Sequence, residues 1–276
     1  MKLSRARLFE EMGLGPVWRL RDGASIADEA APPEVGAGAD EALSIEAPVA
    51  ERAKTPAADR PSTRPVNLDL LDSLDWPGLR ETIAGCTACG LCRERRQAVP
   101  GVGDERADWL FIGEGPGAEE DARGEPFVGQ AGKLLDAMLA AIDLRRGDNV
   151  YIANAVKCRP PGNRTPEAAE IDACRPYLRR QIAMIRPKLI VLLGRAAMQA
   201  VLQEERPLGA SRGKRFEYRD GELLVPVIVT YHPAYLLRNL ADKAKAWEDL
   251  CFARRTMREQ QAAGMDLPLP PLPPAG

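Results

Sequence analysis

The six cysteines of this sequence are the residues whose type and spacing most clearly predict chemistry. Cys86 and Cys89 form a C-x-x-C pair that Cys92 extends, and Cys158 and Cys174 follow far downstream. The first residues lack the uninterrupted apolar stretch of a signal peptide, so we expect a reducing compartment, where disulfides are rare. Thiolates grouped in this way usually hold a metal ion or an iron–sulfur cluster. The pattern therefore predicts a metal centre that ties the segment before the core to the core itself.

The spacing alone leaves the ligands and the metal open. It does not select four of the six cysteines, and it does not distinguish zinc from iron. Some of these thiols could instead be core residues, because a free cysteine packs as a small hydrophobic side chain. Cys251 lies in the helical pattern KAWEDLCFARRTM, and we expect it in the core.

His232 is the only histidine, so any imidazole chemistry must use it. It directly follows an apolar run, where it could act on a ligand or cap the turn before Pro233. A Ser-His-Asp triad is not favoured, because the chain has no G-x-S-x-G motif. Phe127 lies in a polar loop, where its ring could stack on a base or pack beneath the loop. Asn154 ends an apolar run, where its amide could bond a planar polar edge or the local backbone.

The elements expected around these residues alternate between strands and helices. Nearly continuous apolar runs predict strands at residues 109–113, 150–156, 189–193 and 225–230. Pro226 should lie at the start of the last strand or at a sheet edge. Helical spacing predicts helices at residues 130–144, from an N-cap at Thr165 to Ile185, after Gly194, and at residues 242–260. This order predicts an α/β fold, a three-layer α/β/α sandwich with a central, mostly parallel four-stranded sheet.

Ligands of such sheets bind beyond the carboxyl ends of the strands. Three segments directly follow strands: the glycine-rich turn Gly113–Gly117, Asn154 with the stretch CRPPGNR, and Tyr231–Ala234. We therefore expect all three to converge on one rim. The glycine-rich turn permits close approach of the backbone to a ligand, although it lacks the GK[ST] ending of a phosphate-binding loop.

The composition sets limits on the class of protein. The chain has 276 residues, of which 45% are hydrophobic, enough for a sizeable core. A net charge of −2, from 38 basic and 40 acidic residues, neither favours nor excludes nucleic acid. Basic stretches at residues 145–180 and 206–219 suit a phosphate backbone or are solvated faces. No apolar run is long enough to span a membrane, and we expect a cytoplasmic monomer without a membrane partner.

The composition also divides the chain into four parts. Residues 1–21 form a short amphipathic segment, which could bind a partner protein or fold back onto the main domain. Residues 22–67 are rich in alanine, proline and acidic residues, so we expect a disordered linker. Residues 68–262 are predicted to form the folded domain. Residues 263–276 form a proline-rich tail, which we expect to be extended.

Several motifs of this chain occur together in one known family. In order, they are C-x-x-C, GEGPG-x-x-E-D-x-x-G-x-PF-x-G-x-AG-x-LL, N-x-x-KCRPP-x-NR, C-x-P-[YF]-L and TYHPAYLLRN. The set resembles the family 4 uracil-DNA glycosylases, the iron–sulfur type, over about residues 79–255. The resemblance implies a [4Fe–4S] cluster held by Cys86, Cys89, Cys158 and Cys174. It leaves Cys92 and Cys251 outside the ligand set.

The resemblance also implies a reaction, the hydrolysis of the N-glycosidic bond of deoxyuridine in DNA after the base has left the stack. It assigns uracil binding to Gly115, Phe127 and Asn154. It assigns catalysis to His232, Glu114 and Glu120. His232 would stabilise the leaving base at uracil O2, and one of the two carboxylates would orient the attacking water.

The resemblance further implies how DNA is held and what product remains. Leu236, Leu237 and Arg238 would form a loop that wedges into the duplex, and the GASRGKR stretch would contact phosphates. None of the matching motifs places a lysine as an amine nucleophile. The enzyme would therefore be monofunctional and would leave an abasic site without cutting the strand.

Two other interpretations stay open. One is a uracil-binding or single-strand-binding iron–sulfur protein without turnover. A related branch traps DNA through a histidine in an inserted loop and carries GEQPG in the first motif, whereas this chain has GEGPG and a histidine only in its HPA motif. The other is a DNA-binding module associated with replication. Release of uracil over many turnovers would distinguish the enzyme from both.

Overall fold

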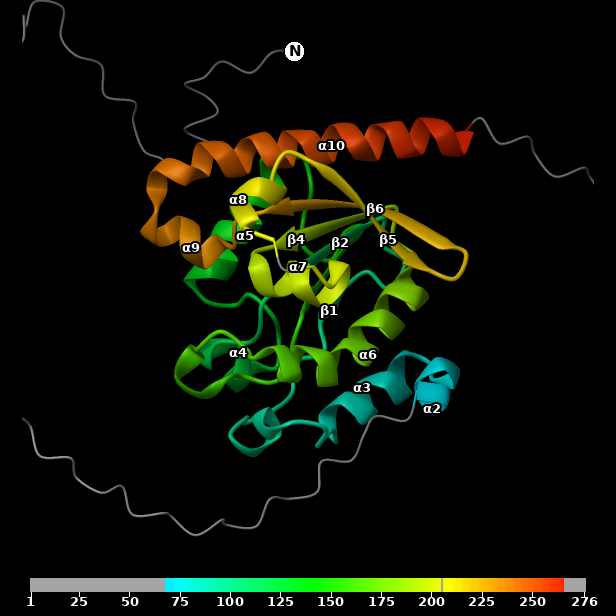
Figure 1. The fold of residues 1–276 in the computed structure, drawn as a ribbon, viewed down its shortest axis with the longest axis vertical. Helices are drawn as coiled ribbons and strands as arrows, with labels where there is room; N and C mark the ends of the chain where they lie inside the picture. The colour runs from blue at the N-terminus through cyan, green and yellow to red at the C-terminus, as the bar shows by residue number, and fades with distance from the viewer. Residues whose placement is uncertain (1–67, 205, 266–276) are drawn as a thin grey trace, which may run out of the picture.

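The parallel strands of the fold are formed by the four apolar runs of the sequence (Figure 1). The structure is a computed structural model, and it describes residues 68–204 and 206–265. The predicted segments 1–21 and 22–67 and most of the proline-rich tail lie outside the described residues. Strands β2 (Trp109–Gly113), β3 (Val150–Asn154), β4 (Leu189–Leu193) and β6 (Leu223–Thr230) pair in parallel.

Two short antiparallel strands complete the sheet, which has the order β1-β3-β2-β4-β6-β5. Strand β1 (Val102–Gly103) pairs with β3, and β5 (Arg215–Asp220) pairs with β6. The mostly parallel sheet confirms the predicted fold class, but the predicted count of four strands was too low. Pro226 lies inside β6 and not at its start. Parallel pairing with β4 begins only at Val227, so the missing N–H of proline is outside that ladder.

The helices alternate with the strands along the chain. The α-helices are α2 (Leu68–Ser73), α3 (Trp76–Ala84), α4 (Ala118–Arg123), α5 (Gln130–Ala140), α6 (Ala168–Ile185), α7 (Arg195–Leu202), α8 (Leu208–Ser211), α9 (Pro233–Arg238) and α10 (Lys243–Met265). Three short 3₁₀ segments are η1 (Gly90–Arg93), η2 (Pro161–Asn163) and η3 (Leu240–Asp242). None of the described helices is long and apolar enough to cross a membrane.

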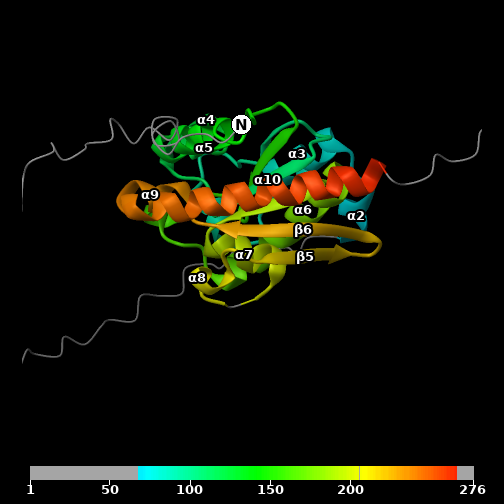
Figure 2. The same cartoon turned by 90° about the horizontal axis from the view of Figure 1, so that it is seen from above.

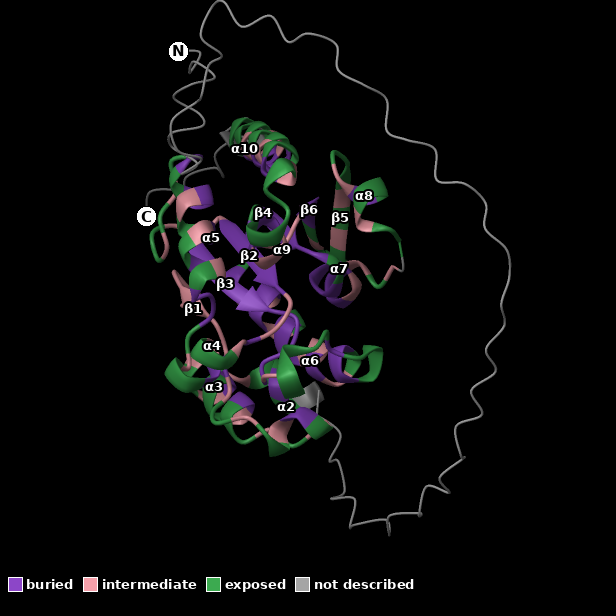
Figure 3. Cartoon of the chain, turned by 90° about the vertical axis from the view of Figure 1, so that its left-hand side faces the viewer, coloured by how far each residue is buried: buried purple, intermediate pink, exposed green. Residues whose placement is uncertain are grey.

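The central strands are buried on both faces (Figure 3). On one face, β2 residues such as Leu110 pack with α6 and α7, represented by Leu178 and Met198. On the other face, Phe111 packs with Leu139 of α5 and with α10. Figure 2 shows α10 running along its side of the sheet. Burial of each large aliphatic side chain contributes about 1.5–3 kcal/mol, so the three predicted layers are held by apolar packing on both faces.

Three local predictions differ from the structure. The N-cap of α6 is Glu167, not Thr165, because the Glu170 carboxylate accepts a bond from the Glu167 N–H at 2.8 Å. Helix α5 ends at Ala140, earlier than predicted, and the chain then turns through Asp143 at a φ of 63°. Cys251 is exposed, not in the core. It follows Leu250 on α10 and is rotated about 100° from it, away from the face that packs on the sheet.

The first helices bring the cysteine-bearing segment onto the sheet. Leu79 and Ile83 of α3 and Leu91 of η1 are buried in the same core cluster as α6. Trp76 packs on Tyr151 of β3, with ring centroids 5.3 Å apart. The segment that carries Cys86 and Cys89 is therefore fixed against α6 and the end of β3.

Candidate active site and cysteine site

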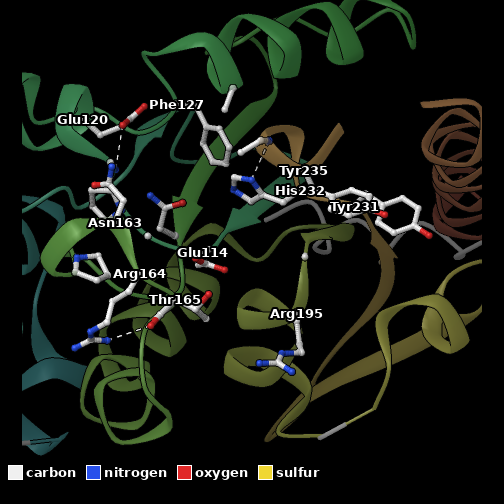
Figure 4. Close-up of a pocket in the computed structure, with 18 of the residues that line it drawn as sticks. Glu114, Glu120, Phe127, Asn163, Arg164, Thr165, Arg195, Tyr231, His232 and Tyr235 are labelled. Carbon is white, nitrogen blue, oxygen red and sulfur yellow. Dashed lines mark hydrogen bonds between the residues drawn. The ribbon is translucent and has the colours of Figure 1, made fainter. Parts of the chain in front are cut away.

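A cleft of about 680 Å³ opens at the carboxyl ends of the parallel strands (Figure 4). All three segments that the sequence placed there contribute to its walls, so the predicted convergence on one rim is confirmed. The lining residues include Glu114, Gly115, Glu120, Phe127, Asn154, His232 and Arg238. Tyr231 and Arg164, which belong to two of these segments, also line the cleft. Tyr235 and Arg195 line it as well, and neither was predicted as a site residue. Arg195 could have been found, because it lies two residues after the end of β4, at the same rim.

The Phe127 ring lies beside His232, with ring centroids 5.4 Å apart and the planes at 29°. Phe127 has a φ of 56°, a left-handed conformation that costs about 1–3 kcal/mol in a residue other than glycine. The guanidinium of Arg146 donates to the carbonyls of Pro126 and Phe127, each at 2.8 Å. A Cβ on Gly132 would lie 1.8 Å from the Phe127 oxygen. These contacts hold the strained turn that presents the ring to the cleft.

Asn154 presents an unpaired oxygen beside that ring. The residue is 2% exposed, and its Oδ1 atom has no hydrogen-bond partner within the described residues. Gly113 lies directly behind it, where a Cβ would be 2.5 Å from Oδ1 of Asn154 and 2.5 Å from Cζ of Phe127. An unpaired buried acceptor costs about 1–3 kcal/mol, so a ligand that donates to it is strongly favoured.

His232 is the N-cap of α9, which confirms the capping alternative. It also lines the cleft, and its action on a ligand stays a prediction. The N–H of Ala234 donates to Nδ1 of His232 at 3.2 Å. In a neutral ring the proton must then be on Nε2, which remains able to donate to a ligand. Burial lowers the pKa of His232 to about 4, and the positive charge of Arg238 contributes to the shift. The imidazole is therefore neutral at pH 7.

This depressed pKa can be measured without ambiguity, because a chain with one histidine gives one imidazole Cε1–H signal. Titration of protein labelled with ¹³C-histidine should give a midpoint near 4 in the folded state and near 6.5 in urea. The unfolded chain binds this proton at higher pH, so the folded state should lose stability as pH falls from about 6.5 to about 4. A folded-state midpoint near 6.5 would contradict the neutral, desolvated ring.

The two candidate carboxylates have different surroundings. Glu120 accepts from the N–H groups of Gly117 at 3.0 Å, Val128 at 3.0 Å and Gly129 at 3.2 Å. Its oxygens therefore connect the glycine-rich turn to the Phe127 loop. The Glu114 side chain accepts no hydrogen bond from the described residues, and burial raises its pKa although Arg195 and Arg238 oppose the shift. Glu114 is the carboxylate that remains available to a ligand or a water.

The predicted wedge is only partly placed at the surface. Leu236 is 1% exposed and packs in the core, so it does not face DNA. Leu237 is 42% exposed, and Arg238 lines the cleft. The three residues end helix α9 and do not form a loop, so consecutive side chains point in different directions. Leu240, a residue of η3 that was not predicted to contact DNA, is 59% exposed.

The basic GASRGKR stretch is also partly structural. Arg212 donates to the Asp249 carboxylate at 2.7 Å, and both side chains are largely buried. The Arg212 guanidinium lies 4.7 Å from the centre of the Tyr231 ring. Arg212 therefore fixes the wall of the cleft and is not free to contact a phosphate. Lys214, in contrast, is exposed.

Five cysteines line one small cavity between α3, η1, the end of β3 and α6. They are Cys86, Cys89, Cys92, Cys158 and Cys174. Burial raises the pKa of Cys158 to about 11 and that of Cys174 to about 12. Both thiols must therefore release protons when they bind a metal group.

Four of these sulfurs receive hydrogen bonds. The N–H of Ala88 donates to Cys86 at 3.4 Å, and that of Lys157 donates to Cys174 at 3.3 Å. Arg95 donates to Cys158 at 2.9 Å, and the Leu91 main chain donates to Cys89. Donors of this kind stabilise thiolates that bind iron–sulfur clusters. In the described part of the chain no such donor reaches Cys92.

The donor set fits a group bound by four thiolates. Within residues 68–204 and 206–265, no three His, Cys, Asp or Glu side chains are arranged to hold a metal ion, so the fit is carried by the shared cavity and the hydrogen bonds to the sulfurs. Cys86, Cys89, Cys158 and Cys174 are thus distinguished from Cys92 by their hydrogen bonds and not by their position alone. These are the four cysteines that the family resemblance implies as ligands.

The fold and the cleft define a class of protein, an α/β enzyme with an aromatic ring, an amide and a neutral imidazole in one cleft at the carboxyl ends of its strands. Comparison with known proteins makes the class specific. The family model described as the uracil DNA glycosylase superfamily matches residues 100–251. The chain belongs to this superfamily and, by its relatives, to the type-4 uracil-DNA glycosylases.

The similarity to these relatives is high. A type-4 uracil-DNA glycosylase of Pyrobaculum aerophilum is 42% identical over 183 residues, which cover 65% of this chain and 93% of the relative. One from Archaeoglobus fulgidus is 47% identical over 171 residues, covering 60% and 84%. One from Thermotoga maritima is 43% identical over 183 residues, covering 65% and 93%. The resemblance found in the sequence is confirmed.

Proposed function

We propose that this protein is a monofunctional uracil-DNA glycosylase that removes uracil from DNA and leaves an abasic site for base excision repair. The observation that carries the proposal is the unpaired Asn154 oxygen, buried beside the Phe127 ring and His232. Uracil offers an N–H donor next to a carbonyl acceptor, which an amide side chain can bind with both of its groups. The family of the chain supports the same activity.

In this proposal the base enters the cleft after it leaves the DNA stack, which costs a few kcal/mol. Phe127 stacks on the flipped uracil, Asn154 binds its polar edge, and the backbone at Gly115 contributes to the pocket. The exposed Leu237 and the cleft-lining Arg238 contact the duplex. No lysine lines the cleft within the described residues, which is consistent with a glycosylase that forms no amine adduct.

Bond cleavage places negative charge on the leaving uracil, and His232 is the residue that stabilises it. A neutral imidazole with its proton on Nε2 donates to O2 more strongly as the charge develops, so it favours the transition state over the ground state. Glu114 orients the water that captures the sugar, since its carboxylate is not engaged by the backbone. Glu120 acts as a positioning residue, through its bonds to the Phe127 loop.

We also propose that Cys86, Cys89, Cys158 and Cys174 hold a [4Fe–4S] cluster. When bound, such a cluster links the segment after α3 to the end of β3 and to α6. It supplies a structural connection near the cleft, because Asn163, Arg164 and Thr165 of the rim lie between the last two cysteines. The cytoplasmic location, the monomeric state and a protein partner for residues 1–21 remain predictions from the sequence.

The cluster proposal predicts the metal content of the purified protein. Protein prepared without oxygen should contain about four irons per chain and be brown. Replacing Cys174 with serine should abolish iron binding, whereas Cys92→Ser should retain it, because Cys92 receives no hydrogen bond of the kind that supports a thiolate. Iron and zinc are measured by elemental analysis. Stoichiometric zinc in the wild type, or loss of iron in Cys92→Ser, would contradict the ligand set.

The function is tested with oligonucleotides that carry one uracil, in single-stranded and in double-stranded form. We expect release of free uracil over many turnovers, with an abasic site that breaks only after alkali treatment. Binding without release, or a covalent protein–DNA product, would support the non-catalytic alternatives instead. Strand cleavage without alkali would show that the enzyme is not monofunctional.

A further inference from the structure

Lys157 lies behind the candidate active site, next to Cys158 and three residues after Asn154. The residue is 2% exposed, which is rare for lysine. Its ammonium group donates to the main-chain oxygen of Asn154 at 2.8 Å and to Oε1 of Gln181 at 2.7 Å. Both acceptors are neutral, so within the described residues no carboxylate pairs with the buried charge.

A buried ammonium group without a carboxylate is costly, because it loses its hydration and its hydrogen bonds reach only neutral acceptors. Thiolates at Cys174 and Cys158 would offset part of this cost. A methionine would fill a similar volume at a lower cost. Compared with methionine, lysine adds a positive charge near these two cysteines and N–H donors. Those donors hold the carbonyl at which β3 leaves the sheet.

The second acceptor of the ammonium is itself fixed. Gln181 of α6 is fully buried, and its amide donates to the main-chain oxygen of Pro100 at 2.8 Å. The Lys157 backbone is held as well, because its N–H donates to Cys174 at 3.3 Å and its carbonyl accepts from Val99 at 2.8 Å. The ammonium is thus a rigid donor and not a mobile one.

Asn154 depends on such a donor more than an ordinary buried residue does. Its side-chain oxygen has no partner, so no protein hydrogen bond at that atom fixes the direction of the amide. The orientation of the amide must then come from the backbone of Asn154 and from side chains packed around it. The Asn154 carbonyl is the backbone group that Lys157 holds.

We infer that Lys157 is a positioning residue that acts through Asn154, by fixing the backbone from which the amide reaches the uracil edge. The inference rests on the proposed function, in which Asn154 binds the base. It also connects the cysteine site to the base-binding site through one residue. The main-chain N–H of Lys157 donates to Cys174, a predicted cluster ligand, and its side chain donates to the main-chain oxygen of Asn154, the residue proposed to bind the base.

A double-mutant cycle tests this inference with single-turnover excision from a uracil-containing oligonucleotide. Lys157→Met should slow excision by about tenfold or more in the wild-type background. The same change should slow it by less than about twofold when Asn154 is already alanine, since the residue through which it acts is absent. In a His232→Ala background the effect of about tenfold should persist, because Lys157 holds Asn154 and makes no hydrogen bond to His232.

Binding gives a readout that does not depend on turnover. The dissociation constant for an oligonucleotide with a non-hydrolysable, 2′-fluorinated deoxyuridine should rise with Lys157→Met, but not when the change is added to Asn154→Ala. Iron content and thermal unfolding are compared in every variant. If Lys157→Met loses iron or does not fold, Gln181→Met leaves Lys157 in place and removes one of its acceptors, and it should show the same dependence on Asn154.

The outcomes separate this inference from the proposed function. Wild-type protein that releases no uracil would overturn the function itself. Wild-type protein that is active, together with Lys157→Met at the wild-type rate, would overturn only the role of Lys157. An equal loss of rate in the wild-type and Asn154→Ala backgrounds would likewise overturn it, because the effect would then be a general structural one.

Discussion

Replacing His232 with alanine is expected to slow uracil release by about 10²–10³-fold, the usual effect of losing one donor to a developing negative charge. The imidazole is neutral, and its Nδ1 atom is occupied by the Ala234 N–H, so Nε2 is its donor. Removal of that donor leaves the leaving uracil without stabilisation at O2. The affinity for uracil-containing DNA should change little, because the bond strengthens mainly in the transition state. Single-turnover rates and binding constants are measured on the same oligonucleotide.

His232→Asn is the matched control for this variant, because His232 also caps helix α9. Asparagine is a good N-cap and should preserve the helix, whereas alanine loses about 1 kcal/mol of stability. Asparagine does not carry the ring N–H, so excision should fall as far as in His232→Ala. If His232→Asn excised uracil at the wild-type rate, the histidine would be only a capping residue.

Replacing Gly113 with alanine is expected to reduce excision by about a hundredfold or more, although the new methyl group touches no substrate. The added Cβ would lie 2.5 Å from atoms of both Asn154 and Phe127, closer than any real contact allows. Gly113 ends β2 in the centre of the sheet, so its backbone cannot move far. The amide and the aromatic ring must therefore shift. Both uracil binding and the single-turnover rate should fall.

Gly209→Ala is the control, because a Cβ at that glycine has open space within 4 Å. It should excise uracil at the wild-type rate. Thermal unfolding should show that Gly113→Ala is still folded, which separates a displaced site from a lost fold. Wild-type excision by a folded Gly113→Ala protein would mean that Phe127 and Asn154 do not both contact the base.

The sequence predicts the central strands well because each is a short apolar run that is buried on both faces. The edge strands escape this pattern. Strand β1 has two residues, and the sequence RFEYRD of β5 is half exposed and charged, so neither resembles a buried strand. Helix ends were less predictable because they depend on particular side-chain contacts. The start of α6 depends on Glu170, whose carboxylate binds both the Glu167 N–H and Arg164.

The residues of the cleft could be named from motifs, but their separate tasks could not. Glu114 and Glu120 are both acidic residues of one motif, and only the three backbone N–H groups on Glu120 distinguish them. Leu236 and Leu237 are adjacent and chemically identical, yet one is buried and the other exposed. That difference comes from the helical phase of α9. The strained turn at Phe127 and its contact with Arg146 join residues far apart in sequence, so no local pattern predicts them.

The part of the cleft wall around Arg164 belongs to the segment between Cys158 and Cys174, and both of these cysteines line the cysteine cavity. A bound cluster would close this stretch into a ring, whereas its loss would leave the stretch anchored chiefly by the Arg164–Glu170 pair. The buried sheet is held instead by apolar packing on both of its faces. If the proposed cluster forms, loss of iron would therefore loosen the part of the cleft wall that carries Asn163, Arg164 and Thr165.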